Sequence, residues 1–261
     1  MTPRPALPLA TLPLAALLLL AAPTFAFAQA QATIKPDGRF RSAFGAGASY
    51  ASGNTSAASV NLSGDAVRAT SDSKWQLGGR ANWGRTEGVT TVENLALGTQ
   101  YDRDLTPNWF GFGKADYLRD RPANVAARGS LFGGLGRHVI KTETLTFDLS
   151  AGLGYTEDRY VDPADVNGGL RSRYGRAEAL LAEESRHQFT PTTAFHQKLS
   201  LYPALRSGGG YRGVFDSGLS VAMNDTLSLT AGLNYRYNSD PGVGVKKGDT
   251  LFVTGISVKL D

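Results

Sequence analysis

The stretch from Leu145 to Tyr155 alternates without a break between apolar or small residues at odd positions and polar residues or glycine at even positions. A period of two residues is that of a β-strand, whose successive side chains point to opposite faces of a sheet. The polar positions include Asp148 in mid-strand, and many other segments of the chain have the same pattern. Charges along one face and apolar residues along the other are typical of a transmembrane antiparallel β-barrel, which has lipid outside and a polar lumen.

The first 28 residues predict a cleaved signal peptide that precedes the fold. Arg4 gives a basic start, residues 9–22 form an apolar run, and Ala26-Phe27-Ala28 offers the small residues that a signal peptidase needs. We therefore expect a mature chain that begins near Gln29. Its first part, residues 29–38, would be a short periplasmic segment, and residues 39–261 would form the barrel of a bacterial outer membrane.

The mature chain divides into about twelve alternating strands, an even number as in bacterial single-chain barrels. In the strand over 109–119 the outward face is ambiguous, because Phe110 and Phe112 compete with Trp109 and Tyr117 for the apolar side. The expected strands cover residues 39–50, 56–68, 75–83, 91–103, 109–119, 128–139, 145–155, 174–186, 195–203, 211–223, 227–237 and 249–260.

The connections between these strands alternate in length, which predicts the topology. Short turns at 70–74, 104–108, 140–144 and 223–226 alternate with longer segments such as 157–173 and 239–248. Short turns lie in the periplasm and longer loops lie outside the cell, so both termini are expected in the periplasm. We interpret the acidic part of 157–173 as a solvated loop, since it lacks the alternating Asp/Asn and the closing Glu of a calcium loop.

Charged residues on the inward face are the candidate functional residues, and their signs nearly balance. A barrel of eight strands is filled by side chains and one of sixteen holds water, so a barrel of about twelve could do either. Long charged side chains could line a narrow pore, or pair across the lumen and close it. The lumen-lining candidates are Arg80, Lys114, Asp116, Arg128, Asp148, Arg176, Glu178, Arg212, Asp216 and Arg236.

Two classes of function stay open at this point. The first is a passive channel for small polar solutes or ions. The second is a non-conducting structural or envelope-stress barrel with an ion-paired lumen, whose loops bind lipopolysaccharide or a partner. A third, an outer-membrane hydrolase, would need a serine activated by histidine, but none of His138, His187 and His196 has a serine two residues further on.

We therefore expect no enzyme activity, no cofactor and no metal site. The expected partners are outer-membrane lipids, lipopolysaccharide and the barrel assembly machinery. The basic residues are scattered along the chain, a distribution that does not favour nucleic-acid binding. The oligomeric state stays open.

Several short motifs in order along the chain resemble those of the salt-induced outer membrane protein family, domain of unknown function 481. The resemblance would cover about Arg41 to Leu260 and implies an outer-membrane barrel, but no catalytic residues. One departure concerns assembly: such barrels commonly end on an aromatic residue, whereas this chain ends Lys259-Leu260-Asp261. The motifs are Ser52-Gly53-Asn54-Thr55, Lys114-Ala115-Asp116-Tyr117 with Arg119-Asp120, Gly134-Leu135-Gly136, Tyr235-Arg236-Tyr237 with Ser239-Asp240-Pro241, and Lys246-Lys247-Gly248-Asp249-Thr250.

Overall fold

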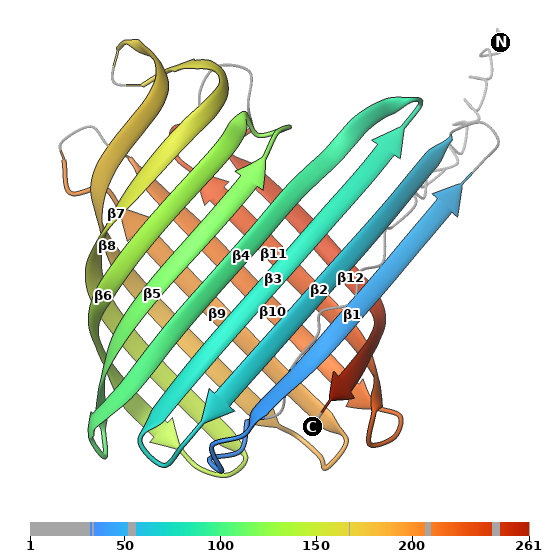
Figure 1. Ribbon diagram of the computed structural model, residues 1–261, viewed down its shortest axis with the longest axis vertical. Coiled ribbons are helices and arrows are strands. Elements are labelled where there is room, and N and C mark those ends of the chain that lie inside the picture. The colour runs from blue at the N-terminus through green and yellow to red at the C-terminus, as the bar shows by residue number, and fades with distance from the viewer. Residues whose placement is uncertain are drawn as a thin grey trace, which may run out of the picture.

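Twelve antiparallel strands close into a single barrel in the computed structural model of the chain (Figure 1). The structure describes residues 32, 34–51, 56–166, 168–206, 210–241 and 246–260, so the expected signal peptide lies outside the described residues. Within these ranges, no helix is both long and apolar enough to cross a membrane. The strands are β1 (Phe40–Ala51), β2 (Ala57–Ala69), β3 (Ser73–Thr86), β4 (Val89–Thr106), β5 (Trp109–Asp120), β6 (Val125–Lys141), β7 (Leu145–Asp165), β8 (Leu170–Gln188), β9 (Thr193–Pro203), β10 (Tyr211–Ala222), β11 (Leu227–Asn238) and β12 (Gly248–Leu260).

Each strand that the alternation predicts is present, and each pairs with its neighbour in the chain. The ring closes where β1 meets β12. That seam is short: β1 has twelve register partners on β2 but five on β12, from Ser42↔Leu260 to Ala46↔Ile256. The wall is therefore least extensively paired along the part of this seam that lies beyond Ala46 on β1.

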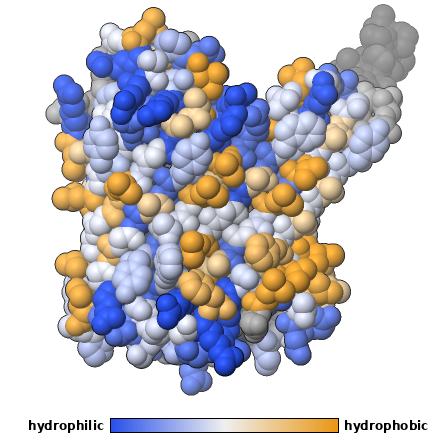
Figure 2. Space-filling view, in the orientation of Figure 1, coloured by the Kyte–Doolittle hydropathy of each residue, from blue (hydrophilic) through white to orange (hydrophobic). Residues whose placement is uncertain are grey.

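The outer face of the wall is apolar, as the alternation predicts. Leu131 and Leu153 are 66% and 63% exposed, although both are large aliphatic residues. Figure 2 shows such residues across the middle of the barrel, while hydrophilic residues gather at its two ends. Among the outward aromatic residues, Trp75 and Trp109 lie near the end that carries the termini of the barrel, and Trp83 and Tyr155 lie toward the other. This distribution is that of a lipid-facing belt flanked by interfacial aromatics.

The prediction of a loop over 157–173 is wrong in extent. β7 and β8 continue through most of this segment and form a hairpin that projects beyond the rest of the barrel (Figure 1). Glu157 and Asp158 pair in register with residues of β8, and Arg173 donates a hydrogen bond to Glu157. Cross-strand hydrogen bonds and pairs of opposite charge keep the hairpin ordered where apolar alternation has ended.

Five hydrophobic residues form a buried cluster inside the barrel, where the sequence predicts a polar lumen. Phe110 and Phe112 of β5 are 4% and 7% exposed, so they face inward, while Trp109 and Tyr117 face lipid. This settles the ambiguity of the strand over 109–119. We call the set the apolar plug; its members are Phe110, Phe112, Phe132, Leu180 and Tyr202.

Candidate functional site in the barrel lumen

The lumen contains a cavity of about 460 Å³ that brings together most of the predicted residues. Asp148 does not line it. That residue lines a separate cavity of about 20 Å³, together with Phe110, Phe112 and Leu180 of the apolar plug. The predicted residues that line the larger cavity are Arg80, Lys114, Asp116, Arg128, Arg176, Glu178, Arg212, Asp216 and Arg236.

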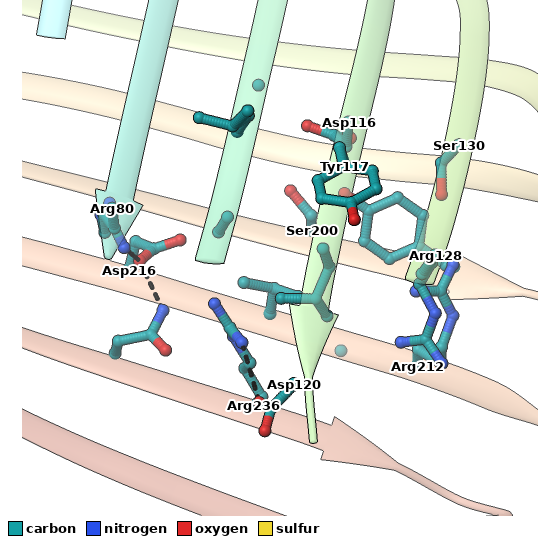
Figure 3. A pocket seen from close by; sticks show the side chains of 18 of the residues that line it. Arg80, Asp116, Tyr117, Asp120, Arg128, Ser130, Ser200, Arg212, Asp216 and Arg236 are labelled. Carbon is teal, nitrogen blue, oxygen red and sulfur yellow. Dashed lines mark hydrogen bonds and ion pairs between the residues drawn. The ribbon is translucent and has the colours of Figure 1, made fainter. Parts of the chain in front are cut away.

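An ion pair crosses the middle of this cavity. Arg80 Nη1 on β3 lies 2.8 Å from Asp216 Oδ1 on β10, and Asn234 Nδ2 donates to the same carboxylate oxygen at 2.6 Å. In the ring, four strands separate β3 from β10 by the shorter way round, so the two residues come from opposing walls. Figure 3 shows Arg80 and Asp216 reaching toward each other across the lumen.

Two further contacts join opposing walls. Arg236 Nη1 on β11 lies 3.6 Å from Asp120 Oδ2 on β5, which is diametrically opposite in the ring (Figure 3). Lys198 Nζ on β9 donates to Gln100 Oε1 on β4 at 3.2 Å. Together with Arg80–Asp216 we call these the transluminal contacts. They bridge the lumen at three places.

On the β6–β8 side, three arginines surround two buried carboxylates. Asp158 and Glu178 are each 1% exposed. Arg128 donates to Asp158, and Arg176 contacts both carboxylates, at 2.7 Å to Asp158 Oδ2 and 2.9 Å to Glu178 Oε1. Arg212 Nη2 donates to Glu178 Oε2 at 2.5 Å. We call these five residues the arginine cluster.

Asp158 is one of the lumen residues absent from the candidates that the sequence predicts, which also lack Asp120, Gln100 and Lys198 of the transluminal contacts. We interpreted Asp158 as part of a solvated loop, whereas it is buried between Arg128 and Arg176. A signal was present: Thr156 and Asp158 continue the even, inward positions of the strand that begins at Leu145. The number of acidic residues nearby hid this continuation.

Tyr202 links the arginine cluster to the apolar plug. The Arg212 guanidinium lies 4.9 Å from the centre of the Tyr202 ring, and the Phe132 and Tyr202 rings lie 5.2 Å apart. Lys114 Nζ donates to the Tyr202 hydroxyl at 3.3 Å and also contacts Asp116. Such cation–π and aromatic contacts fix the plug against the charged wall above it.

Below the apolar plug, His138 lies between two carboxylates. Its Nδ1 is 2.7 Å from Asp148 Oδ1, and its Nε2 is 3.2 Å from Asp104 Oδ1. Lys141 Nζ donates to the other oxygen of Asp104 at 2.9 Å. Both ring nitrogens of His138 are thus engaged by acidic side chains, an arrangement that offers neither of them to a serine.

The segment before β1 turns back into the barrel. Gly38 has a φ of 76°, a conformation that glycine adopts readily, and its N–H donates to the Ala69 carbonyl at 2.7 Å. Ala32 and Ile34 line the larger cavity. Arg41 donates two hydrogen bonds to Asp37, at 2.8 and 2.5 Å, and this guanidinium lowers the pKa of the Asp37 carboxyl.

Comparisons with known proteins match most of the chain. The family described as "Protein of unknown function, DUF481" matches residues 44–260. The uncharacterized protein YdiY of Escherichia coli K12 is 28% identical over 187 residues, which cover 70% of this chain and 68% of YdiY. Among solved structures, the NanC porin has a TM-score of 0.46 at 12% identity, over 84% of this chain and 97% of NanC. The translocator domain of the autotransporter NalP from Neisseria meningitidis has a TM-score of 0.42 at 10% identity, over 85% and 87%.

Proposed function

The chain belongs to the DUF481 family of proteins of unknown function, and from that premise we propose that it is an outer-membrane barrel whose lumen is closed to ion flow at rest. The transluminal contacts carry the proposal. Arg80 and Asp216 meet at 2.8 Å from opposing walls, so an ion that passes between them must first separate the pair. Such a barrel would act as a structural or envelope-stress protein. Its loops would bind lipopolysaccharide or a partner at the outer end.

Burial supports closure, because charged groups inside the wall are held by one another. Glu178 accepts hydrogen bonds from Arg176, Arg212 and Thr156, and it is 1% exposed. Removing one partner of a buried pair typically costs about 3 to 5 kcal/mol. A conformation that opened a path through the arginine cluster would meet costs of this kind. The apolar plug adds a buried hydrophobic layer next to it.

The outer membrane is the proposed location because the wall has a lipid-facing apolar belt and a polar interior. Outer-membrane lipids and the barrel assembly machinery follow as partners. We propose no enzymatic role: the paired nitrogens of His138 support this, since a nucleophile needs a free base beside it.

Single-channel recording on the refolded mature protein in a planar bilayer tests closure. We expect no steady conductance from the wild type. The double variant Arg80→Ser, Arg212→Ser removes one transluminal contact and one arm of the arginine cluster. Because the other two contacts and the apolar plug remain, we expect it to show brief openings rather than a steady conductance. Arg159→Ser is the matched control, since its side chain is 62% exposed on the projecting hairpin. A steady wild-type conductance would overturn the proposal.

A narrow channel for small polar solutes or ions is the second candidate. The cavity of about 460 Å³ favours it, since its lining runs from Lys247, beside the β11–β12 connection, to Gln76, near the opposite end of β3. In that case the wild type would conduct. Replacing Arg80 and Arg212 by serine would then shift its selectivity toward cations, because the lining loses positive charge.

A further inference from the structure

The lipid-facing wall carries a groove of about 1000 Å³ over β5. We propose that this groove holds one acyl chain of an anionic phospholipid, whose phosphate binds Arg103 and Arg137. The inference rests on the proposed membrane location and goes beyond it by naming a lipid class and its site. Trp75 and Tyr101 form one side of the groove, Leu131 and Leu153 form the other, and Gly113 and Gly133 lie between them.

On β5 the groove lining covers Gly113 to Ala115, and small outward residues continue from it toward the end of the barrel where β1 begins. Gly111, Gly113 and Ala115 occupy successive outward positions between the outward Trp109 and Tyr117. At about 3.3 Å per residue, the stretch from Trp109 to Tyr117 extends about 27 Å. Strands of such barrels tilt by about 35–45°, so this stretch covers about 20 Å of depth in a hydrocarbon layer about 30 Å thick. An acyl chain lying along β5 therefore has room through the depth of one leaflet, which is about half of that layer.

The barrel itself does not need these glycines. A side-chain carbon at Gly113 would meet no atom within 4 Å, and one at Gly133 would meet only the Phe112 carbonyl, at 3.6 Å. Neither has the positive φ that favours glycine. The packing of the wall therefore does not require glycine at either position. In a bilayer the groove has to be filled, since an empty groove loses dispersion contacts along both its sides.

Two arginines flank the outer face of β5 beyond the groove lining, where the headgroup of the proposed lipid would lie. Arg103 is the register partner of Gly111 on one side of β5, and Arg137 is the partner of Trp109 on the other. The Arg137 guanidinium lies 5.9 Å from the centre of the Trp109 ring. Arg103 pairs with Asp72 at 2.9 Å, and both side chains are about half exposed, so a phosphate can compete for the guanidinium.

The pair of guanidinium groups favours a phosphate with a net negative headgroup, because such groups bind phosphate oxygens with geometric specificity. Both arginines lie at the end of the barrel where β1 begins, β12 ends and the short turns are found. The lipid is therefore placed in the leaflet at that end. In the proposed orientation this is the periplasmic leaflet, whose phospholipids supply both the chain and the charge.

Fluorescence quenching of Trp75 tests the site directly. The chain has three tryptophans, and the variant Trp83→Phe, Trp109→Tyr leaves Trp75 alone at the groove while keeping an aromatic ring under Arg137. We would reconstitute it in phosphatidylcholine vesicles that contain the same fraction of either brominated phosphatidylglycerol or brominated phosphatidylcholine. A basic residue near a membrane surface gives a roughly fivefold preference for anionic lipid. We expect stronger quenching by the glycerol lipid, and a loss of the preference in Arg103→Gln, Arg137→Gln.

Three controls make the result specific. Gly113→Leu places a side chain in the groove, at a position where its Cβ meets no atom within 4 Å, and should abolish the preference. Gly129→Leu, also on the outer face with nothing within 4 Å but outside the groove lining, should leave it intact. A barrel with Trp83 alone reports on lipid away from the groove and should show little preference.

Equal quenching by the two lipids, or a preference that survives Gly113→Leu, would overturn the proposal. A wild-type dimer that becomes a monomer in Gly113→Leu would also overturn it, because the groove would then bind a second copy of the chain. The measurement does not depend on the lumen. A conducting wild type would end the proposed closure and leave this result unchanged.

Discussion

Leu233 and Asn234 are neighbours on β11 that face opposite sides of the wall, and arginine should separate the two environments. Leu233→Arg places a charge toward lipid, where the cost is about 2 to 4 kcal/mol near the midplane. Leu149→Arg on β7 should behave alike, since Leu149 is 46% exposed on the outer face. Asn234→Arg is the control: it lines the cavity beside Asp216 and should cost less. Urea unfolding in vesicles measures the difference, and equal costs on both faces would contradict the register.

Within the lumen, two arginines should differ in their contribution to stability because their pairs differ in burial. Arg212 pairs with Glu178, and these side chains are 11% and 1% exposed. Glu178 keeps Arg176 and Thr156 as partners, so Arg212→Ser should cost about 3 kcal/mol, the lower end for a broken buried pair. The Arg80–Asp216 pair is more open, at 36% and 20%, and Arg80→Ser should cost nearer to about 1 kcal/mol. Unfolding curves that rank the two the other way would contradict this assignment.

At the scale of elements, the segment before β1 should protect the inward face of β2. Val67 is 4% exposed and lines the same cavity as Ile34. The chain has no cysteine, so Val67→Cys gives a single thiol for a water-soluble maleimide. Labelling should be slow in the full mature chain and faster after deletion of residues 29–36. Thr106→Cys, exposed beside a short turn, should label equally in both, and an unchanged rate at Val67→Cys would show that the segment does not cover β2.

The twelve strands were predictable because a wall with lipid on one side and polar groups on the other imposes alternation on every strand. The same rule failed where the environment changes. Beyond Thr156 both faces of the β7–β8 hairpin carry charge, so the alternation of hydrophobicity ends although the strands continue. In β5 the inward Phe110 and Phe112 break the pattern, because the lumen there is filled by the apolar plug.

At the scale of the whole molecule, the location is open to a simple test. The mature protein should begin near Gln29 and fractionate with outer membranes, since a closed wall with an apolar outer face is insoluble without lipid or detergent. N-terminal sequencing of the protein from a separated envelope measures both. Recovery of most of the protein in the soluble periplasmic fraction would contradict the barrel's placement in a membrane.

The pairing inside the lumen could not be predicted, although most of its residues could. The inward positions of Arg80, Asp216, Arg236 and Glu178 follow from the parity of their strands. Which cation meets which carboxylate depends on the curvature and shear of the closed ring, which set the strands that face each other. Asp120 shows this: it ends β5 and meets Arg236 only because β11 stands opposite.

The transluminal contacts also bear on the order of events in folding. Arg80 and Asp216 are 136 residues apart in the chain, and Gln100 and Lys198 are 98 apart. Hairpins can form between neighbouring strands early, but these partners meet only when the sheet has curled far enough for β1 to reach β12. Contacts absent from the transition state leave the folding rate nearly unchanged and slow unfolding instead. The transluminal contacts would therefore lengthen the lifetime of the folded barrel without speeding its formation.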